Sequence, residues 1–215
     1  MDYTKLIGDR DIPGSIANWM NDSRIPSVAD DIIGDAFGNI CMRLRHWRMQ
    51  TTPTTVTVAA GADGIVVPDD FIEPAFLTYA GDGSPLEMST IEEVVSRFAY
   101  VNNVKQAGRP SRYCLLQEEL VFDIKTDQQY LMLMSYYQRP AALSSENTTN
   151  WLTKLYPRLV RTALMISAAE WMKDSGQGNF DRTYWTVVFQ DQLNAAQIDS
   201  DRSKRALVAR PIIMR

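Results

Sequence analysis

Apolar residues near the amino end recur at helical spacing, in two pieces that together cover about residues 12 to 50. The first piece is short and places Ile16, Trp19 and Met20 on one face. The second piece is longer, and its apolar stripe consists of Val28, Ile32, Ala36, Ile40, Leu44 and Trp47. The pattern therefore predicts a short helix followed by a long one.

Residues 51–140 alternate apolar and polar positions in short runs separated by turn residues, which is typical of antiparallel strands. One predicted hairpin joins residues 54–60 to 65–67 through GADG, and a second joins 75–80 to 86–88 through GDGSP. A short helix (IEEVVSRF) and a three-stranded meander ending in QYLMLMSYY follow. Both faces of that last strand are apolar, so we expect both to be covered.

Helical spacing returns after the polar connector SSENTTN, residues 144–150. Proline is tolerated in a first helical turn but costs about 3 kcal/mol in a helix interior, so Pro157 marks the predicted start of a helix that runs to about residue 173. A last helix is expected after an Asn179 cap, with apolar positions at Phe180, Tyr184, Val187, Val188 and Leu193. The order is helices, then strands, then helices, which predicts an α+β fold.

Composition narrows the class of protein. The 215 residues are 45% hydrophobic and 22% charged, as in globular domains, and they include two cysteines and one histidine. That is too few for a Cys/His zinc site or a disulfide framework. No apolar run reaches the roughly 18 residues of a membrane span, and the amino end is too polar for a signal peptide. We expect a soluble intracellular product.

Charge is distributed unevenly along the chain. The last 14 residues, 202–215, hold five basic and no acidic residues, whereas residues 1–201 hold 17 basic and 26 acidic ones, a net charge of −9. A basic, partly apolar tail thus follows an acidic body. The tail is either an arm that docks on nucleic acid or on another protein, or a solvated end.

Candidate catalytic residues are few. His46 lies among arginines at the end of the long helix, where we expect a packing role, and Cys41 and Cys114 fall in apolar patterns typical of core thiols. Adjacent acidic pairs point in different directions and are expected at the surface or at helix caps. Glycine runs lack the GK[ST] of a phosphate-binding loop. No catalytic, cofactor or metal site is predicted, which leaves a binding or structural protein.

Six motifs in order resemble the head-to-tail connector (adaptor) proteins of tailed bacteriophages. The motifs are DIPGSIANWMND, IPSVADDIIGDAFGNICMRLRHWRM, VVPDDFIEP, GRPSRY, SYYQRPAALSS and NWLTKLYPRLVRTALMISAAEWM. Each motif is degenerate alone, but unrelated α/β/α proteins have no reason to share all of them in this order. The resemblance covers most of the chain, and the family has no catalytic motif to transfer.

The resemblance implies a fold and an assembly. Residues 1–50 and 144–201 would form one helical bundle, residues 51–143 an inserted antiparallel β domain, and residues 202–215 an extended C-terminal arm. Subunits of the family form a ring, commonly of twelve copies, beneath the portal protein, and DNA passes through it without sequence-specific binding. The implied partners are the portal, a tail or nozzle protein and further copies of the chain. The implied location is the virion, after synthesis in the host cytoplasm.

Two groups of residues are the candidate interaction sites. The portal-binding arm is expected to use Arg205, Leu207, Val208, Arg210, Ile212, Ile213 and Arg215. A subunit interface is expected at Arg43, Arg45 and Arg48, which crowd the last turns of the long helix and also favour its dipole there. The alternative function is a nucleic-acid-binding regulator that uses the basic tail.

Overall fold

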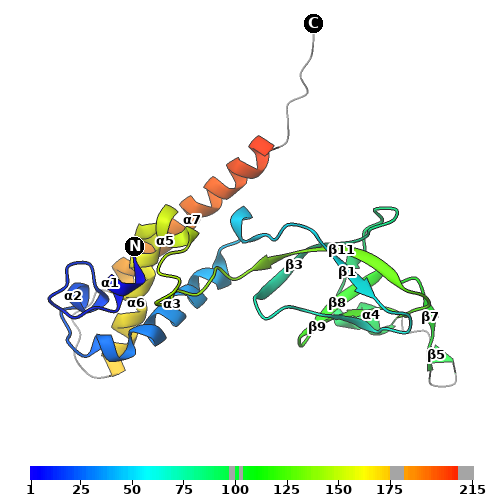
Figure 1. Ribbon diagram of the computed structural model, residues 1–215, viewed down its shortest axis with the longest axis horizontal. Helices are drawn as coiled ribbons and strands as arrows, with labels where there is room; N and C mark the ends of the chain where they lie inside the picture. The colour runs from blue at the N-terminus through cyan, green and yellow to red at the C-terminus, as the bar shows by residue number, and fades with distance from the viewer. Residues whose placement is uncertain (97–99, 102–103, 175–181, 208–215) are drawn as a thin grey trace, which may run out of the picture. The chain divides into compact units, whose positions relative to one another are not determined.

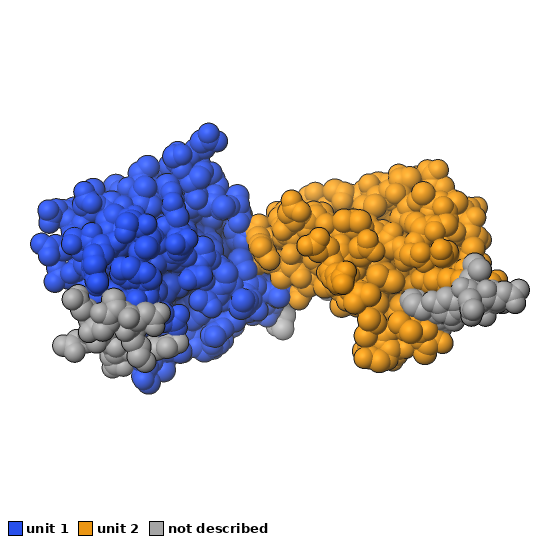
Figure 2. All heavy atoms as spheres, turned by 90° about the horizontal axis from the view of Figure 1, so that it is seen from below, with its two compact units in different colours: residues 1–47, 140–215 blue, residues 48–139 orange. Residues whose placement is uncertain are grey.

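The computed structural model describes residues 1–96, 100–101, 104–174 and 182–207. The chain divides into two compact units: residues 1–47 with 140–215 form the helical unit, and residues 48–139 form the β unit (Figures 1 and 2). Each unit buries its own set of apolar side chains. The predicted mixed α+β class is confirmed.

The helical unit is organised around one central helix. Its elements are α1 (Tyr3–Leu6), α2 (Ile16–Met20), a 3₁₀ helix (Ile25–Val28), α3 (Ala29–Arg43), α5 (Trp151–Leu155), α6 (Pro157–Asp174) and α7 (Arg182–Leu207). Helix α6 packs against α2, α3 and α7 (Figure 1). The buried faces recur every three or four residues, as in Ile32, Ala36 and Ile40 of α3. The predicted start at Pro157 is confirmed.

Helix α3 is shorter than its apolar stripe predicts. Val28 belongs to the preceding 3₁₀ helix, and α3 ends at Arg43 because Leu44 adopts an extended conformation. Leu44 remains buried all the same. The Arg45 side chain satisfies carbonyls at the helix end, donating from Nη1 to the oxygens of Cys41 at 2.5 Å and Leu44 at 3.0 Å. The end of the helix is therefore stabilised without another turn, and the prediction of a helix to about residue 50 is wrong.

The β unit holds two main sheets. A 3₁₀ helix (Trp47–Met49) crosses the boundary between the units, with Trp47 in the helical unit. The elements of the β unit are β1 (Thr54–Val58), β2 (Gly64–Val66), β3 (Phe71–Tyr79), β4 (Glu87–Met88), α4 (Ile91–Ser96), β5 (Tyr100–Val101), β6 (Val104–Lys105), β7 (Ala107–Gly108), β8 (Arg112–Leu116), β9 (Glu119–Phe122), β10 (Lys125–Thr126) and β11 (Tyr130–Gln138). The strand orders are β1-β11-β3 and β2-β9-β8-β4, and β10-β7 and β5-β6 form two small pairs.

Strand pairing differs from the predicted hairpins. The first hairpin does not form, because β1 pairs with β11 and β2 pairs with β9. The meander is wrong in its third strand, since β8 pairs with β9 but β11 lies between β1 and β3. At the second predicted hairpin the chain does reverse, with the N–H of Tyr79 bonded to the carbonyl of Ser84 at 2.9 Å, but β4 then pairs in parallel with β8. Pairing follows the side chains that meet in the core, and these are far apart in sequence.

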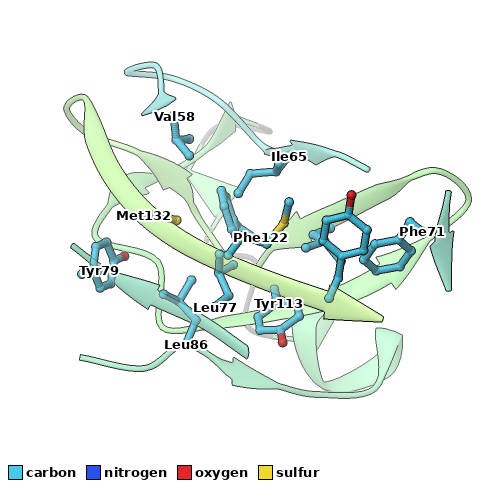
Figure 3. Packing of buried hydrophobic residues seen from close by; sticks show 12 residues of the cluster. Val58, Ile65, Phe71, Leu77, Tyr79, Leu86, Tyr113, Phe122 and Met132 are labelled. Atoms are coloured by element: carbon cyan, nitrogen blue, oxygen red, sulfur yellow. The ribbon is translucent and has the colours of Figure 1, made fainter. Parts of the chain in front are cut away.

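The core of the β unit lies on one face of β11 (Figure 3). Its members are Val58, Ile65, Phe71, Leu77, Tyr79, Leu86, Tyr113, Leu120, Phe122, Met132, Met134 and Tyr136. The opposite face of β11 is less covered, and Leu131 is 51% exposed. The expectation that both faces are covered therefore fails at Leu131, whereas on the same face Ser135 is buried and Leu133 and Tyr137 are half-buried.

Helix α7 continues further than the sequence pattern suggests. It is helical to Leu207, so the first six residues of the predicted extended arm, 202–207, are helical instead. Their composition permits this, because Arg, Lys, Ala and Leu all have high helix propensity. The predicted cap Asn179 and residues 208–215 lie outside the described residues.

Candidate interaction surfaces

Two of the family-like motifs bind each other within the β unit. The Tyr136 hydroxyl of SYYQRPAALSS donates to Oδ1 of Asp70 in VVPDDFIEP at 3.0 Å. The N–H of Arg139 donates to the carbonyl of Asp70 at 2.8 Å. Burial, followed by the bond to Asp70, raises the pKa of Tyr136. These contacts fix the loop before β3 against the end of β11, so the motif residues hold the fold together.

The GRPSRY motif closes over a turn. The Arg109 guanidinium lies 4.0 Å from the centre of the Tyr79 ring, and its Nη2 is 2.6 Å from Oδ2 of Asp82 in the GDG turn. The Tyr79 hydroxyl donates to the carbonyl of Pro110 at 2.6 Å, and burial raises the pKa of Tyr79 to about 12. The N–H of Ser84, followed by Arg109, lowers the pKa of Asp82 to about 2. The contacts of the GRPSRY motif therefore also lie within the β unit, where they hold the turn.

The Asn-Trp-Leu motif starts a helix. Asn150 accepts from the N–H of Thr153 at 3.0 Å, and the Thr153 hydroxyl accepts from the N–H of Asn150 at 3.0 Å, which completes a capping box at α5. Nδ2 of Asn150 also donates to the carbonyl of Ala141 at 3.0 Å. The contact ties the returning chain to the helical unit.

His46 is buried, with 1% of its surface exposed, in the segment between α3 and the next 3₁₀ helix. Its ring stacks on Trp151 at 4.9 Å, and Nε2 lies 3.1 Å from the Tyr156 hydroxyl, which in turn donates to Asp199. The expected packing role agrees with this setting, although the histidine does not belong to the helix. Cys41 and Cys114 are both buried, and burial raises the pKa of Cys114. The described residues hold no cluster of metal ligands.

The three arginines of the predicted subunit interface have different surroundings. Arg43 is exposed at the end of α3, with its guanidinium 5.8 Å from the centre of the Phe189 ring. Arg45 is half-buried and bonded to the carbonyls at the α3 end. Arg48 is exposed and belongs to the β unit. The structure thus does not gather them into one cluster within a unit.

The predicted arm begins inside α7. Arg205 and Leu207 occupy its last turn, with side chains that are not described, and Val208, Arg210, Ile212, Ile213 and Arg215 lie outside the described residues. The described outer face of α7 carries an apolar stripe, to which two of the predicted apolar positions, Tyr184 and Val187, belong. Tyr184, Val187 and Ile198 are 57%, 58% and 50% exposed. Their three- and four-residue spacing through Asp191 and Ala195 places them on one face, opposite the buried Phe189 and Leu193. We name this face the α7 stripe.

A shallow groove borders this helix on another side. Its wall consists of Asn39 and Arg43 from α3, Ala163, Ile166 and Glu170 from α6, and Thr186 and Phe189 from α7. None of the helices in the described residues is both long and apolar enough to cross a membrane.

The family-like motifs thus contact one another within each unit and position its loops and helices. The chain matches the family described as SU10 adaptor protein over residues 10–214, and it belongs to that family of phage head-tail adaptors. No curated protein matches the chain. Membership makes it a structural adaptor of the virion, in a family that contacts components such as portal and tail and is not a class of enzymes.

Proposed function

We propose that this adaptor assembles as a ring, with twelve as the expected number of copies, between the portal vertex and a tail or nozzle protein. The observation that carries the proposal is the family match, which spans both units and reaches residue 214. DNA passes through the ring without sequence-specific binding. A net charge of −9 over residues 1–201 suits such a passage, because basic groups in a channel bind phosphates and impede movement.

The C-terminal segment is the proposed portal-binding element. It combines Arg205, Arg210 and Arg215 with Leu207, Val208, Ile212 and Ile213. Arginines pair bidentately with carboxylates, and the aliphatic side chains contribute about 1.5 to 3 kcal/mol each when buried, before ordering costs. An arm that binds only DNA has little use for so many aliphatic residues.

The proposed subunit interface uses the arginines at the end of α3 and beyond it. Arg43 and Arg48 are exposed, so acidic residues of a neighbouring copy can reach them. Arg45 contributes less, because its guanidinium already binds two carbonyls of its own chain. An Arg43→Gln, Arg48→Gln variant is expected to weaken ring formation, whereas Arg10→Gln, an exposed arginine near the amino end, serves as the matched control.

The test is assembly on the purified portal, followed by sedimentation and electron microscopy. Twelve copies of the 24.4 kDa chain add about 290 kDa to the portal particle. A chain that lacks residues 208–215 should remain folded and lose portal binding. If the truncated chain instead binds portal as tightly as the full chain and loses only salt-sensitive affinity for DNA, the portal-arm proposal is wrong.

A further inference from the structure

The segment that follows α3 binds the last part of α7. The N–H of Arg45 donates to Oε1 of Gln197 at 3.2 Å, and the N–H of Trp47 donates to Oγ of Ser200 at 2.9 Å. Between them the Tyr156 hydroxyl donates to Oδ2 of Asp199. Two backbone donors beyond the end of α3 are therefore satisfied by side chains of α7. We name these contacts the α7 clamp.

His46 completes the clamp from inside. The Tyr156 hydroxyl uses its one hydrogen in the hydrogen bond to Asp199, so its oxygen can only accept from His46. This contact requires the imidazole hydrogen to be on Nε2. The stacked Trp151 ring holds the imidazole in place. Asp199 is 61% exposed at its side chain, whereas His46 is buried, so the bonded chain connects the interior of the helical unit to α7.

The clamp lies at the last fully buried position among the described side chains of α7. Among the described side chains of α7, Ser200 is the last fully buried one; Asp201 and Arg202 are exposed, and Ser203 and Lys204 are half-buried. About two turns of helix separate Ser200 from Leu207, after which the proposed portal-binding segment begins. The buried contacts of a helix help to set the direction in which its end points.

We propose that the α7 clamp fixes the direction in which α7 presents the C-terminal segment, and that His46 and Tyr156 are positioning residues for portal binding. The inference rests on the proposed function of that segment. Loss of the clamp leaves the portal-binding side chains intact but presents them in many directions, so ordering them on the portal costs more free energy.

Two variants test the clamp. Tyr156→Phe removes both bonds of the hydroxyl and keeps the ring, and Ser200→Ala removes the acceptor of the Trp47 N–H. Gln190→Ala is the matched control, because the exposed Gln190 donates to the exposed Asn194 one turn along α7 and, within the described part of the chain, makes no contact with the clamp. Amide hydrogen exchange in residues 201–207 should accelerate about tenfold in both clamp variants and stay unchanged in the control. Portal affinity should fall by about tenfold while exchange in α6 stays at the wild-type rate.

Further variants of His46 separate positioning from packing. His46→Gln retains a donor toward Tyr156 and should keep more portal affinity than His46→Leu. Unchanged exchange at residues 201–207 in both clamp variants overturns the proposal, and so does faster exchange with wild-type portal affinity. If the chain without residues 208–215 binds portal normally, the proposed arm function fails by itself. The exchange data then still decide whether the clamp holds the end of α7.

Discussion

The two units use their buried polar side chains in different ways. In the β unit these side chains bind loops to the sheets: Asp123 accepts from the N–H and hydroxyl of Ser111 at 3.1 and 2.7 Å, and the Thr126 hydroxyl donates to the carbonyl of Ala59 at 2.6 Å. In the helical unit some of them bind at or beyond the ends of helices, as Asn150 does at the start of α5 and Ser200 does beyond the end of α3. These polar groups thus hold loops in the β unit and helix ends in the helical unit.

This difference indicates how each unit responds to change. Loss of one of these hydrogen bonds in the β unit frees a loop, while the strands on either side of it remain paired through the backbone. Loss of one in the helical unit alters where a helix begins, ends or points. The helical unit also carries the α7 stripe and the C-terminal segment. All five tryptophans belong to the helical unit, at positions 19, 47, 151, 171 and 185. Their fluorescence therefore reports on that unit alone.

The largest expected effect comes from a core deletion in the β unit. Phe122 is fully buried, and Phe122→Ala should destabilise this unit by about 3 to 5 kcal/mol through lost burial and a cavity. Urea unfolding followed by hydrogen exchange should show β11 opening at lower urea, while the tryptophan transition stays where it is. Phe122→Leu should cost less. A tryptophan transition that shifts equally would mean that the two units unfold together.

Alkaline pH should weaken the β unit next. The folded pKa of Tyr79 is raised by burial to about 12, against about 10 in the unfolded chain. Its contribution is complete below pH 10 and is lost as the pH rises toward 12, because the unfolded chain ionises first. Tyr79→Phe should remove this part of the pH dependence, and it should also destabilise the unit at neutral pH by about 1 to 3 kcal/mol through the unpaired carbonyl of Pro110. Equal alkaline stability losses in both proteins contradict the assignment.

In the helical unit, loss of the capping box should lower the free energy of unfolding by a smaller amount. Asn150→Ala removes the acceptor for the N–H of Thr153, which is worth about 1 kcal/mol, typically 0.5 to 2. The tryptophan transition should move to lower urea, and exchange in β11 should not change. Asn150→Asp keeps an acceptor oxygen and should retain most of the stability. If Asn150→Asp loses as much as Asn150→Ala, the cap is not the source of the effect.

Local patterns predicted the helices well and the sheets poorly. Helix α6 begins at Pro157 as expected, because helical periodicity and proline geometry act within a few residues. The pairing of β1 with β11 depends on core side chains more than 70 positions apart, for which the nearby turn GADG gave the wrong partner. The end of α3 was missed because Trp47 binds Ser200, on a helix that follows the whole β unit in sequence.

The candidate sites also depend on contacts between residues that are far apart in sequence. The ordered motifs led to the adaptor family, which the family match confirms. Their physical role was not visible in sequence, because Asp70 meets Tyr136 and Asp82 meets Arg109 only in the fold. The α7 stripe was also missed, since Tyr184 and Val187 have a spacing that is equally typical of a buried face. Periodicity finds an apolar face but does not say which molecule covers it.

The smallest expected effect is an acid dependence in the β unit. Asp82 is nearly half exposed, and the N–H of Ser84 with Arg109 lowers its pKa to about 2, below the usual value of 3.8. Its contribution is therefore present above pH 4 and is lost as the pH falls toward 2, because the unfolded chain takes up the proton first. Asp82→Asn should flatten this part of the acid dependence when exchange in β3 is measured at several pH values, and high salt should reduce the difference.

Asp69→Asn, at an exposed carboxylate of the same unit, should keep the wild-type dependence. If both variants flatten it equally, general charge reduction is responsible and the contact of Asp82 with Arg109 and Ser84 is not.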